Sequence, residues 1–238
     1  MYECGKFRPQ QQKIKNMRQL FLLIAVLFTT ALFGQTKHEK ELSNFVPKGF
    51  VISERINGDL NKDGVADCVL LIKGTDKKKI IKDENSEKVD RNRRGIIILF
   101  NKNNHYELAT KNYDCFSSAN EDGGVYFAPE LSIDIVKGNL CIDYGHGRYG
   151  SCRYSFRFRD SDFELIGYNS SDNSGPVVNR ETSINFLSKR KKTKENTNQN
   201  ATEDGDEIFK ETWAKIQVDK LVKLSEIKDF DKLDFDSN

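Results

Sequence analysis

The chain has 238 residues, with 38 lysine and arginine residues against 36 aspartate and glutamate residues. Residues 1–34 carry five of the basic residues and one of the acidic ones, so the other 204 residues hold 33 basic and 35 acidic side chains. This near-neutral balance offers no global basic field, and the sequence has no zinc-finger, RRM or helix-turn-helix signature, so we expect no nucleic-acid partner. The length suits one β domain with a sizeable core.

The first predicted element is a secretory signal peptide over residues 1–34. An almost unbroken apolar run covers residues 20–33, which is short of the roughly twenty residues that a spanning helix requires, and basic residues precede it. Met17 is a candidate true start, and cleavage before Gln35 would leave a mature chain without a membrane span. We therefore predict export to the periplasm or the medium. An uncleaved membrane anchor is the alternative interpretation.

Oxygen donors stand at every second position of residues 59–67, around one glycine. A Ca²⁺ ion takes six to eight oxygens at roughly 2.3–2.6 Å, so a short loop must curl until alternate side chains converge, and glycine allows the bend. A plain polar turn is the alternative, although three carboxylates without a cation would repel one another by about 1 kcal/mol per close pair in water. We therefore predict a calcium loop. Its ligands are the side chains of Asp59, Asn61, Asp63 and Asp67 and the backbone carbonyl of Val65.

Residues 50–56 before this loop are rich in β-branched side chains and residues 68–72 after it are apolar, so the predicted order is strand, loop, strand. The sequence Gly-Asp-Leu-Asn-Lys-Asp-Gly-Val-Ala-Asp at 58–67, followed by an apolar strand, resembles the calcium loop of FG-GAP/VCBS-type repeats. The resemblance implies calcium at the five positions named above, with residues 94–100 and 105–109 as the third and fourth strands of one propeller blade. Propellers need typically four to eight blades, and the loop occurs once. We therefore expect a smaller β domain.

The region from residue 45 to about 187 consists of short apolar runs separated by turn signals. Residues 152–158 alternate strictly, which is typical of an antiparallel strand with one face in water. Residues 77–94 are mostly charged and predict a solvated excursion between strands. We predict an all-β, mainly antiparallel fold, either a sandwich or partial propeller-like sheets joined by hairpins, with the β domain over residues 35–187.

Two segments follow the predicted β domain. Residues 188–207 are charged and polar and predict a loop or linker; a nucleic-acid or heparin patch in their basic part is the alternative, which the adjoining acidic stretch disfavours. Residues 208–238 predict an extension that returns to the β domain. Within it, residues 212–218 alternate like a strand that would pair with residues 183–187, and a short helix at 208–216 is the alternative.

Four of the five cysteines lie after residue 34, and an even number suggests disulfides in an exported protein. Cys141 and Cys152 lie symmetrically about a glycine-rich turn, so a two-residue hairpin turn would place them opposite each other. Cys68 and Cys115 would then pair by elimination. The alternative is four buried thiols, because the sequence does not determine strand register.

The glycine-rich segment at residues 143–150 is the predicted ligand site. Glycines let the backbone approach a partner, while Tyr, His and Arg offer stacking and hydrogen bonds to a glycan or a protein ligand. The alternative is a structural hairpin turn whose glycines adopt positive φ. The predicted ligand-binding residues are Tyr144, His146, Arg148 and Tyr149.

No motif of an activated nucleophile or a metalloprotease accompanies these residues. The predicted function is therefore an exported, calcium-stabilised, non-catalytic binding or structural module. The alternative is a periplasmic or secreted glycan hydrolase that uses a carboxylate pair such as Asp134 and Asp143. Such an enzyme needs two carboxyl groups about 5–10 Å apart in a cleft.

Overall fold

The computed structural model describes residues 41–82, 87–103, 105–120 and 129–235. The chain divides into two compact units, residues 1–45 and 46–238. The predicted signal peptide and its cleavage site lie outside the described residues. In the part of the chain that is described, no helix combines the length and the apolar character that a membrane span requires.

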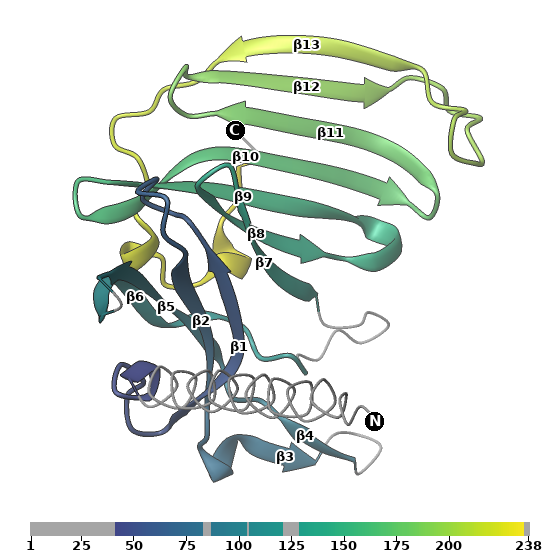
Figure 1. Ribbon diagram of the computed structural model, residues 1–238. Helices are drawn as coiled ribbons and strands as arrows, with labels where there is room; N and C mark the ends of the chain where they lie inside the picture. Colours follow the sequence, from purple (N-terminus) through teal and green to yellow (C-terminus); the bar gives the residue numbers. More distant parts are fainter. Residues whose placement is uncertain (1–40, 83–86, 104, 121–128, 236–238) are drawn as a thin grey trace, which may run out of the picture. The chain divides into compact units, whose positions relative to one another are not determined.

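The second unit consists mainly of antiparallel strands, which confirms the predicted all-β class (Figure 1). In spatial order, its first sheet contains β1 (Phe50–Gly58), β2 (Asp67–Gly74), β5 (Arg94–Lys102) and β6 (His105–Phe116). The central strands β2 and β5 are buried along most of their length. Burial on both faces explains why their sequences are continuous apolar runs rather than alternating ones.

The charged segment between β2 and β5 forms a small hairpin of its own. It contains the 3-10 turn η1 (Lys77–Lys79) and the paired strands β3 (Ile80–Lys82) and β4 (Lys88–Asp90). Most of its described side chains are exposed, as expected for a solvated excursion. Strands of three residues are too short to leave a period-2 pattern in the sequence.

The second sheet is a seven-stranded meander in which each strand pairs with the next one along the chain (Figure 1). Two of its connections are two-residue turns with positive φ at both positions, Lys137-Gly138 and Asp160-Ser161. This backbone is that of a type I′ turn, whose twist matches the twist of the flanking strands. The strands are β7 (Glu130–Val136), β8 (Asn139–Gly145), β9 (Gly150–Arg159), β10 (Asp162–Ser174), β11 (Val177–Asn185), β12 (Arg190–Asn196) and β13 (Phe209–Lys215).

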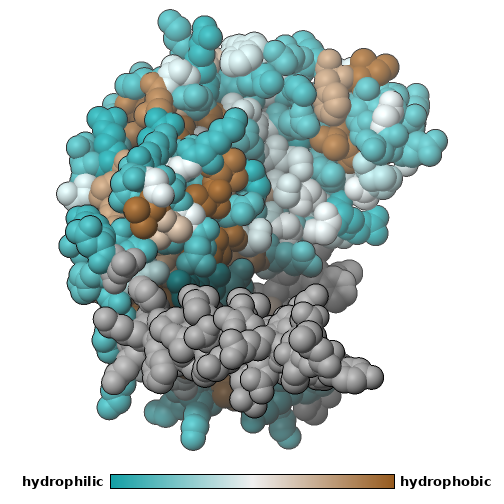
Figure 2. Space-filling view, viewed as in Figure 1, coloured by the Kyte–Doolittle hydropathy of each residue, from teal (hydrophilic) through white to brown (hydrophobic). Residues whose placement is uncertain are grey.

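The prediction of a charged loop or linker over residues 188–207 was wrong in its first half, because β12 lies there. β12 pairs with β11 on one side and with β13 on the other. It has no apolar residue, so hydrophobic periodicity cannot reveal it. Cross-strand ion pairs support it instead, with Lys194 Nζ 2.8 Å from Glu181 Oε2 on β11. β13 therefore pairs with β12 and not with residues 183–187. Figure 2 shows mostly hydrophilic residues along the upper edge of the molecule, where β12 and β13 lie.

The two sheets share one hydrophobic core, to which β2, β5, β8, β9 and β10 contribute buried side chains. The C-terminal segment completes this core through the 3-10 turns η3 (Leu224–Glu226) and η4 (Phe230–Lys232). Leu224 and Phe230 are at most 2% exposed. η3 contacts both β6 and β10, so the C-terminal segment packs against both sheets.

Hydrogen bonds from the half-buried side chain of Asn112 fix the C-terminal segment in place. Asn112 Nδ2 on β6 donates hydrogen bonds to the carbonyls of Leu224, at 2.8 Å, and Ile227, at 2.6 Å. Because buried backbone carbonyls are costly to leave without a donor, these contacts specify one position for the segment and not merely an apolar docking.

The predicted disulfide between Cys141 and Cys152 is contradicted by the strand register. Cys141 pairs with Ser155, and Cys152 pairs with Tyr144, because the connection between β8 and β9 is longer than two residues. An offset of three residues places the two cysteines on opposite faces of the sheet.

The predicted Cys68–Cys115 pairing also fails, since β5 lies between β2 and β6 and the two cysteines are at its opposite ends. The four described cysteines are not joined by disulfides. The register thus favours the alternative of four thiols.

Candidate ligand cavity and calcium loop

The five predicted calcium ligands lie in and directly after the loop that joins β1 to β2. Asp59 accepts hydrogen bonds from the backbone N–H groups of Lys62, at 2.6 Å, and Gly64, at 3.0 Å. Lys62 and Gly64 have φ of 65° and 85°, which turns the chain back on itself. The N–H of Val65 donates to Asp63 Oδ1 at 2.8 Å. The loop is therefore curled around its acidic side chains.

Asp67 is the buried member of the set. Its Oδ2 accepts the N–H of Leu60 at 2.8 Å, and its Oδ1 accepts the N–H of Asn101 at 3.0 Å. Burial raises the pKa of Asp67, against the lowering effect of these hydrogen bonds. Asn101 belongs to β5, so this carboxylate connects the calcium loop to the neighbouring strand.

The donor chemistry of this loop fits calcium. The set offers three carboxylates, one amide oxygen and one backbone carbonyl, all of them the hard oxygen ligands that Ca²⁺ prefers. Each carboxylate oxygen that accepts one N–H keeps a second lone pair. Among the described residues, no group of three or more His, Cys, Asp or Glu side chains is already arranged to hold a metal ion. Calcium binding therefore remains a prediction, and it requires Asn61 Nδ2 to release Asp63 Oδ2, now 2.9 Å away.

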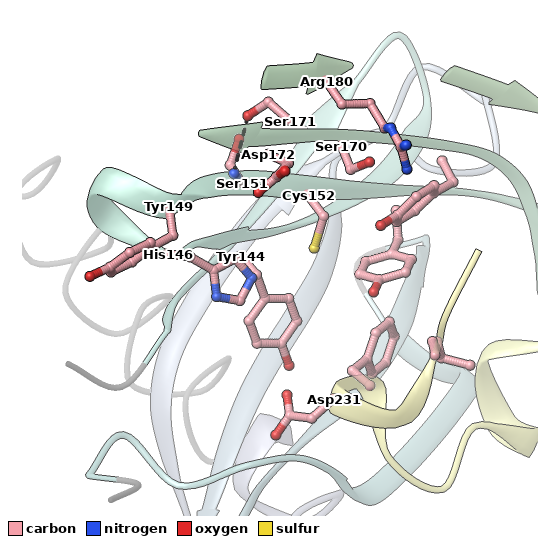
Figure 3. A pocket seen from close by; sticks show the side chains of 14 residues that line it. Tyr144, His146, Tyr149, Ser151, Cys152, Ser170, Ser171, Asp172, Arg180 and Asp231 are labelled. Carbon is pink, nitrogen blue, oxygen red and sulfur yellow. Dashed lines mark hydrogen bonds between the residues drawn. The ribbon is translucent and has the colours of Figure 1, made fainter. Parts of the chain in front are cut away.

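A cavity of about 420 Å³ opens over β8 to β11, beside η4 (Figure 3). The strand register explains its lining. Tyr144 pairs with Cys152 and Cys152 pairs with Ser170, while Tyr154 pairs with Tyr168 in the adjoining row. Residues paired across antiparallel strands point to the same face, so both rows reach the core side of the sheet.

The floor of the cavity is aromatic. The ring of Tyr154 lies 5.2 Å from that of Tyr168 and 5.2 Å from that of Phe230 in η4. Burial raises the pKa of Tyr154, so its hydroxyl stays protonated at neutral pH. Rings at these distances form a packed apolar surface.

Tyr144 differs from the other floor residues because its hydroxyl is buried and has no hydrogen-bond partner in the described part of the chain. The residue is 3% exposed. Among the described residues its Oη has no hydrogen-bond partner. Figure 3 shows this hydroxyl directed toward the carboxylate of Asp231. Burial, and next the charge of Asp231, raise the pKa of Tyr144. The cavity therefore contains a buried, protonated hydroxyl that can donate and accept.

The rim of the cavity is polar and exposed. It includes His146, Asp172, Arg180 and Asp231. Arg180 is paired with Asp172 in the β10–β11 register, and its Nη2 lies 2.8 Å from Glu195 Oε1. The His146 ring stacks on that of Tyr144, with centroids 6.5 Å apart and planes at 16°.

Three of the four predicted ligand-binding residues line this cavity: Tyr144, His146 and Tyr149. The fourth, Arg148, is not among the lining residues, and its guanidinium lies over the Tyr149 ring at 5.8 Å. The turn itself spans residues 146–149, closed by the N–H of His146 donating to the carbonyl of Gly150 at 2.8 Å. A Cβ on Gly150 would lie 1.9 Å from the carbonyl oxygen of Ser171, so this position requires glycine.

The sequence analysis missed much of the cavity. Tyr154, Tyr168 and Asp172 belong to strands, and their period-2 spacing was a usable signal for a shared face. Asp231 comes from the C-terminal segment, and no local pattern connects it with Tyr144.

The carboxylates of the hydrolase hypothesis lie elsewhere. Asp143 neighbours buried Tyr144 on β8 and therefore points to the opposite face of the sheet. Arg153 Nε contacts its Oδ1 at 2.5 Å. Asp134 pairs with Cys141, two residues from Asp143 and on the same face. These two carboxylates therefore lie outside the cavity.

Comparison with protein-family models, with curated proteins and with solved structures found no match for this chain. The geometry of the chain is therefore the basis for its function. The strongest elements of that geometry are the oxygen-rich loop at residues 59–67 and the aromatic cavity with its buried hydroxyl at Tyr144.

Proposed function

We propose that this protein is an exported, non-catalytic binding module whose ligand occupies the cavity above Tyr144. The observation that carries the proposal is the buried hydroxyl of Tyr144, which has no hydrogen-bond partner in the described part of the chain. A buried polar group without a partner costs about 1–3 kcal/mol, and a ligand that provides the partner removes this cost. A concave site with an apolar floor and a few converging polar groups is typical of ligand pockets.

The two carboxylates named in the hydrolase hypothesis do not line the cavity. The pair Asp134 and Asp143 lies on the face away from the cavity, and Arg153 neutralises one member. A glycosidase would need its two carboxyl groups on either side of the bound sugar. The apolar run at residues 20–33 supports export, which would make the ligand a periplasmic or extracellular glycan or protein.

Calcium has a structural part in this proposal. Asp59, Asn61, Asp63, Val65 and Asp67 would hold the ion, which supplies positive charge to a loop rich in carboxylates. Asp67 then keeps its hydrogen bonds to Leu60 and Asn101. The loop, β2 and β5 would be connected more firmly, while the cavity is formed by other strands.

The test is to fill the cavity and measure retention of the exported protein on an array of immobilised glycans and peptides. Ser170→Phe places a ring in the cavity, and Asn169→Phe places the same ring on the opposite face of β10 as a matched control. We expect the wild type and the control to be retained on the same array positions and Ser170→Phe to be lost. Retention of a folded Ser170→Phe variant would place the binding site elsewhere.

A further inference from the structure

The cavity combines two surfaces of different chemistry. Its floor presents the rings of Tyr144, Tyr154, Tyr168 and Phe230, while its rim presents the carboxylates of Asp172 and Asp231, which are both exposed. A sugar ring has the complementary arrangement, because its C–H faces are apolar and its edge carries hydroxyl groups. The apolar face can lie on aromatic rings while the hydroxyls reach carboxylates.

The orientation of the Tyr144 hydroxyl toward Asp231 favours a hydroxyl as the ligand group. The Tyr144 hydroxyl points toward the Asp231 carboxylate (Figure 3), yet it forms no hydrogen bond with any described residue. Ionised Asp231 accepts hydrogen bonds and cannot donate them, whereas the Tyr144 hydroxyl does both. A ligand hydroxyl placed between them can donate to Asp231 and accept from Tyr144, which satisfies both protein groups with one ligand atom.

The charges around the cavity select against anions. Asp172 and Asp231 are acidic, and the guanidinium of Arg180, which is among the described lining residues, is already held by Glu195 at 2.8 Å. A phosphate or an acidic sugar would therefore face two carboxylates, and like charges at close range repel. The cavity of about 420 Å³ lies near the lower end of the usual size for ligand sites, roughly 300–1,000 Å³.

We propose that the cavity binds a neutral sugar ring of a glycan, with one ring hydroxyl bonded between Tyr144 and Asp231 and an apolar ring face on the aromatic floor. This inference rests on the proposed function, because it names the ligand class of the same site. The C-terminal segment, which Phe230 anchors in the core, brings the carboxylate of Asp231 to the sheet that carries Tyr144.

The test is saturation-transfer NMR on the purified exported protein with maltose, cellobiose and N,N′-diacetylchitobiose, and with choline and inorganic phosphate as charged comparisons. We expect transfer to the ring protons of at least one of the sugars and none to choline, and no competition by phosphate. Tyr144→Phe, which removes the buried hydroxyl alone, should weaken that sugar about tenfold, as the loss of one hydrogen bond predicts.

Tyr106→Phe is the matched control. Its hydroxyl, in the first sheet, accepts a hydrogen bond from Arg55 Nη2 at 3.2 Å and lies outside the cavity. The Tyr106→Phe substitution should lower the urea midpoint of unfolding and leave sugar affinity unchanged. Tyr144→Phe should instead leave the urea midpoint unchanged or raise it. Sugar binding that survives Tyr144→Phe overturns the inference. If choline alone binds, and Tyr144→Phe abolishes that binding, the assignment of a sugar as the ligand is wrong, whereas the proposed function of a binding module is retained. No binding by any probe, together with no retention on the array, removes both.

Discussion

Among single residues, Asp67 connects the predicted calcium loop with the neighbouring strand of the first sheet. It is buried, yet it accepts backbone hydrogen bonds from Leu60 in the loop and Asn101 in β5. Burial raises its pKa, which means that the surroundings penalise its charge. Asp63 adds a like charge nearby. A bound cation would offset both costs, so the folded state should gain stability from calcium.

We expect about 1 mM Ca²⁺ to raise the free energy of unfolding by about 1.4 kcal/mol, if the loop binds like extracellular modules with dissociation constants near 10⁻⁴ M. Magnesium should substitute poorly because it demands a tighter octahedron. Urea unfolding with calcium and with chelator measures the effect. Asp63→Ala should abolish it, whereas Asp160→Ala, an exposed turn carboxylate outside the loop, should retain it. A midpoint that ignores chelator in the wild type would contradict calcium binding.

Residues of the candidate site that are close together in the sequence could be predicted, and the distant one could not. Tyr144, His146 and Tyr149 are close together in one glycine-rich segment, so composition alone indicated them. Asp231 reaches the same cavity because Leu224 and Phe230 anchor the C-terminal segment in the core. That anchoring depends on tertiary packing, which local sequence patterns do not encode.

At the scale of elements, β12 and β13 are the least protected part of the seven-stranded sheet. All seven residues of β13 are exposed. Trp213 on β13 lies under Arg190 at 5.8 Å and Lys192 at 5.7 Å, and each such contact is worth about 0.5–1 kcal/mol at an exposed site. Cross-strand side-chain contacts therefore stabilise this pair where apolar burial is small. Elements with little buried apolar surface open before the core.

Trp213 is the single tryptophan of the chain, so its fluorescence reports this edge alone. We expect the fluorescence transition in urea to precede the far-UV circular dichroism transition. Lys192→Glu should widen the gap, because it removes one cation and places like charge near Glu211, now 3.8 Å from Lys192. Lys111→Glu, which removes a similar contact with Tyr113 on β6, is the matched control and should not move the fluorescence transition. If the fluorescence and circular dichroism transitions coincide in the wild type and in Lys192→Glu, the edge formed by β12 and β13 unfolds together with the core.

The difference between β12 and the other strands shows what the sequence reveals. β2 and β5 were predictable because they are apolar, and β9 because it alternates. β12 consists of charged and polar residues, and it is a strand because β11 and β13 provide hydrogen bonds and opposite charges. Hydrophobic patterns in a sequence reveal strands that bury apolar side chains, and no residue of β12 is fully buried.

At the scale of the whole molecule, strand register determines the redox chemistry. A two-residue turn would have set Cys141 opposite Cys152, but five residues, 146–150, lie between the paired residues Gly145 and Ser151. The register is therefore shifted by three residues, and the two cysteines lie on opposite faces of the sheet. Glycines predicted a turn there without specifying its length. The number of residues in one turn thus decides whether a disulfide can form between β8 and β9.

Export and this strand register can be measured on the same sample. The exported protein should begin near Gln35, because the apolar run at 20–33 ends just before it. Denatured without reductant, it should take up four alkyl groups, since Cys141 and Cys152 face opposite sides of the sheet and β5 separates Cys68 from Cys115. Intact-mass analysis with and without reductant measures both. A retained leader would refute cleavage. Uptake that rises on adding reductant would show a disulfide, and with it a strand register different from the one described.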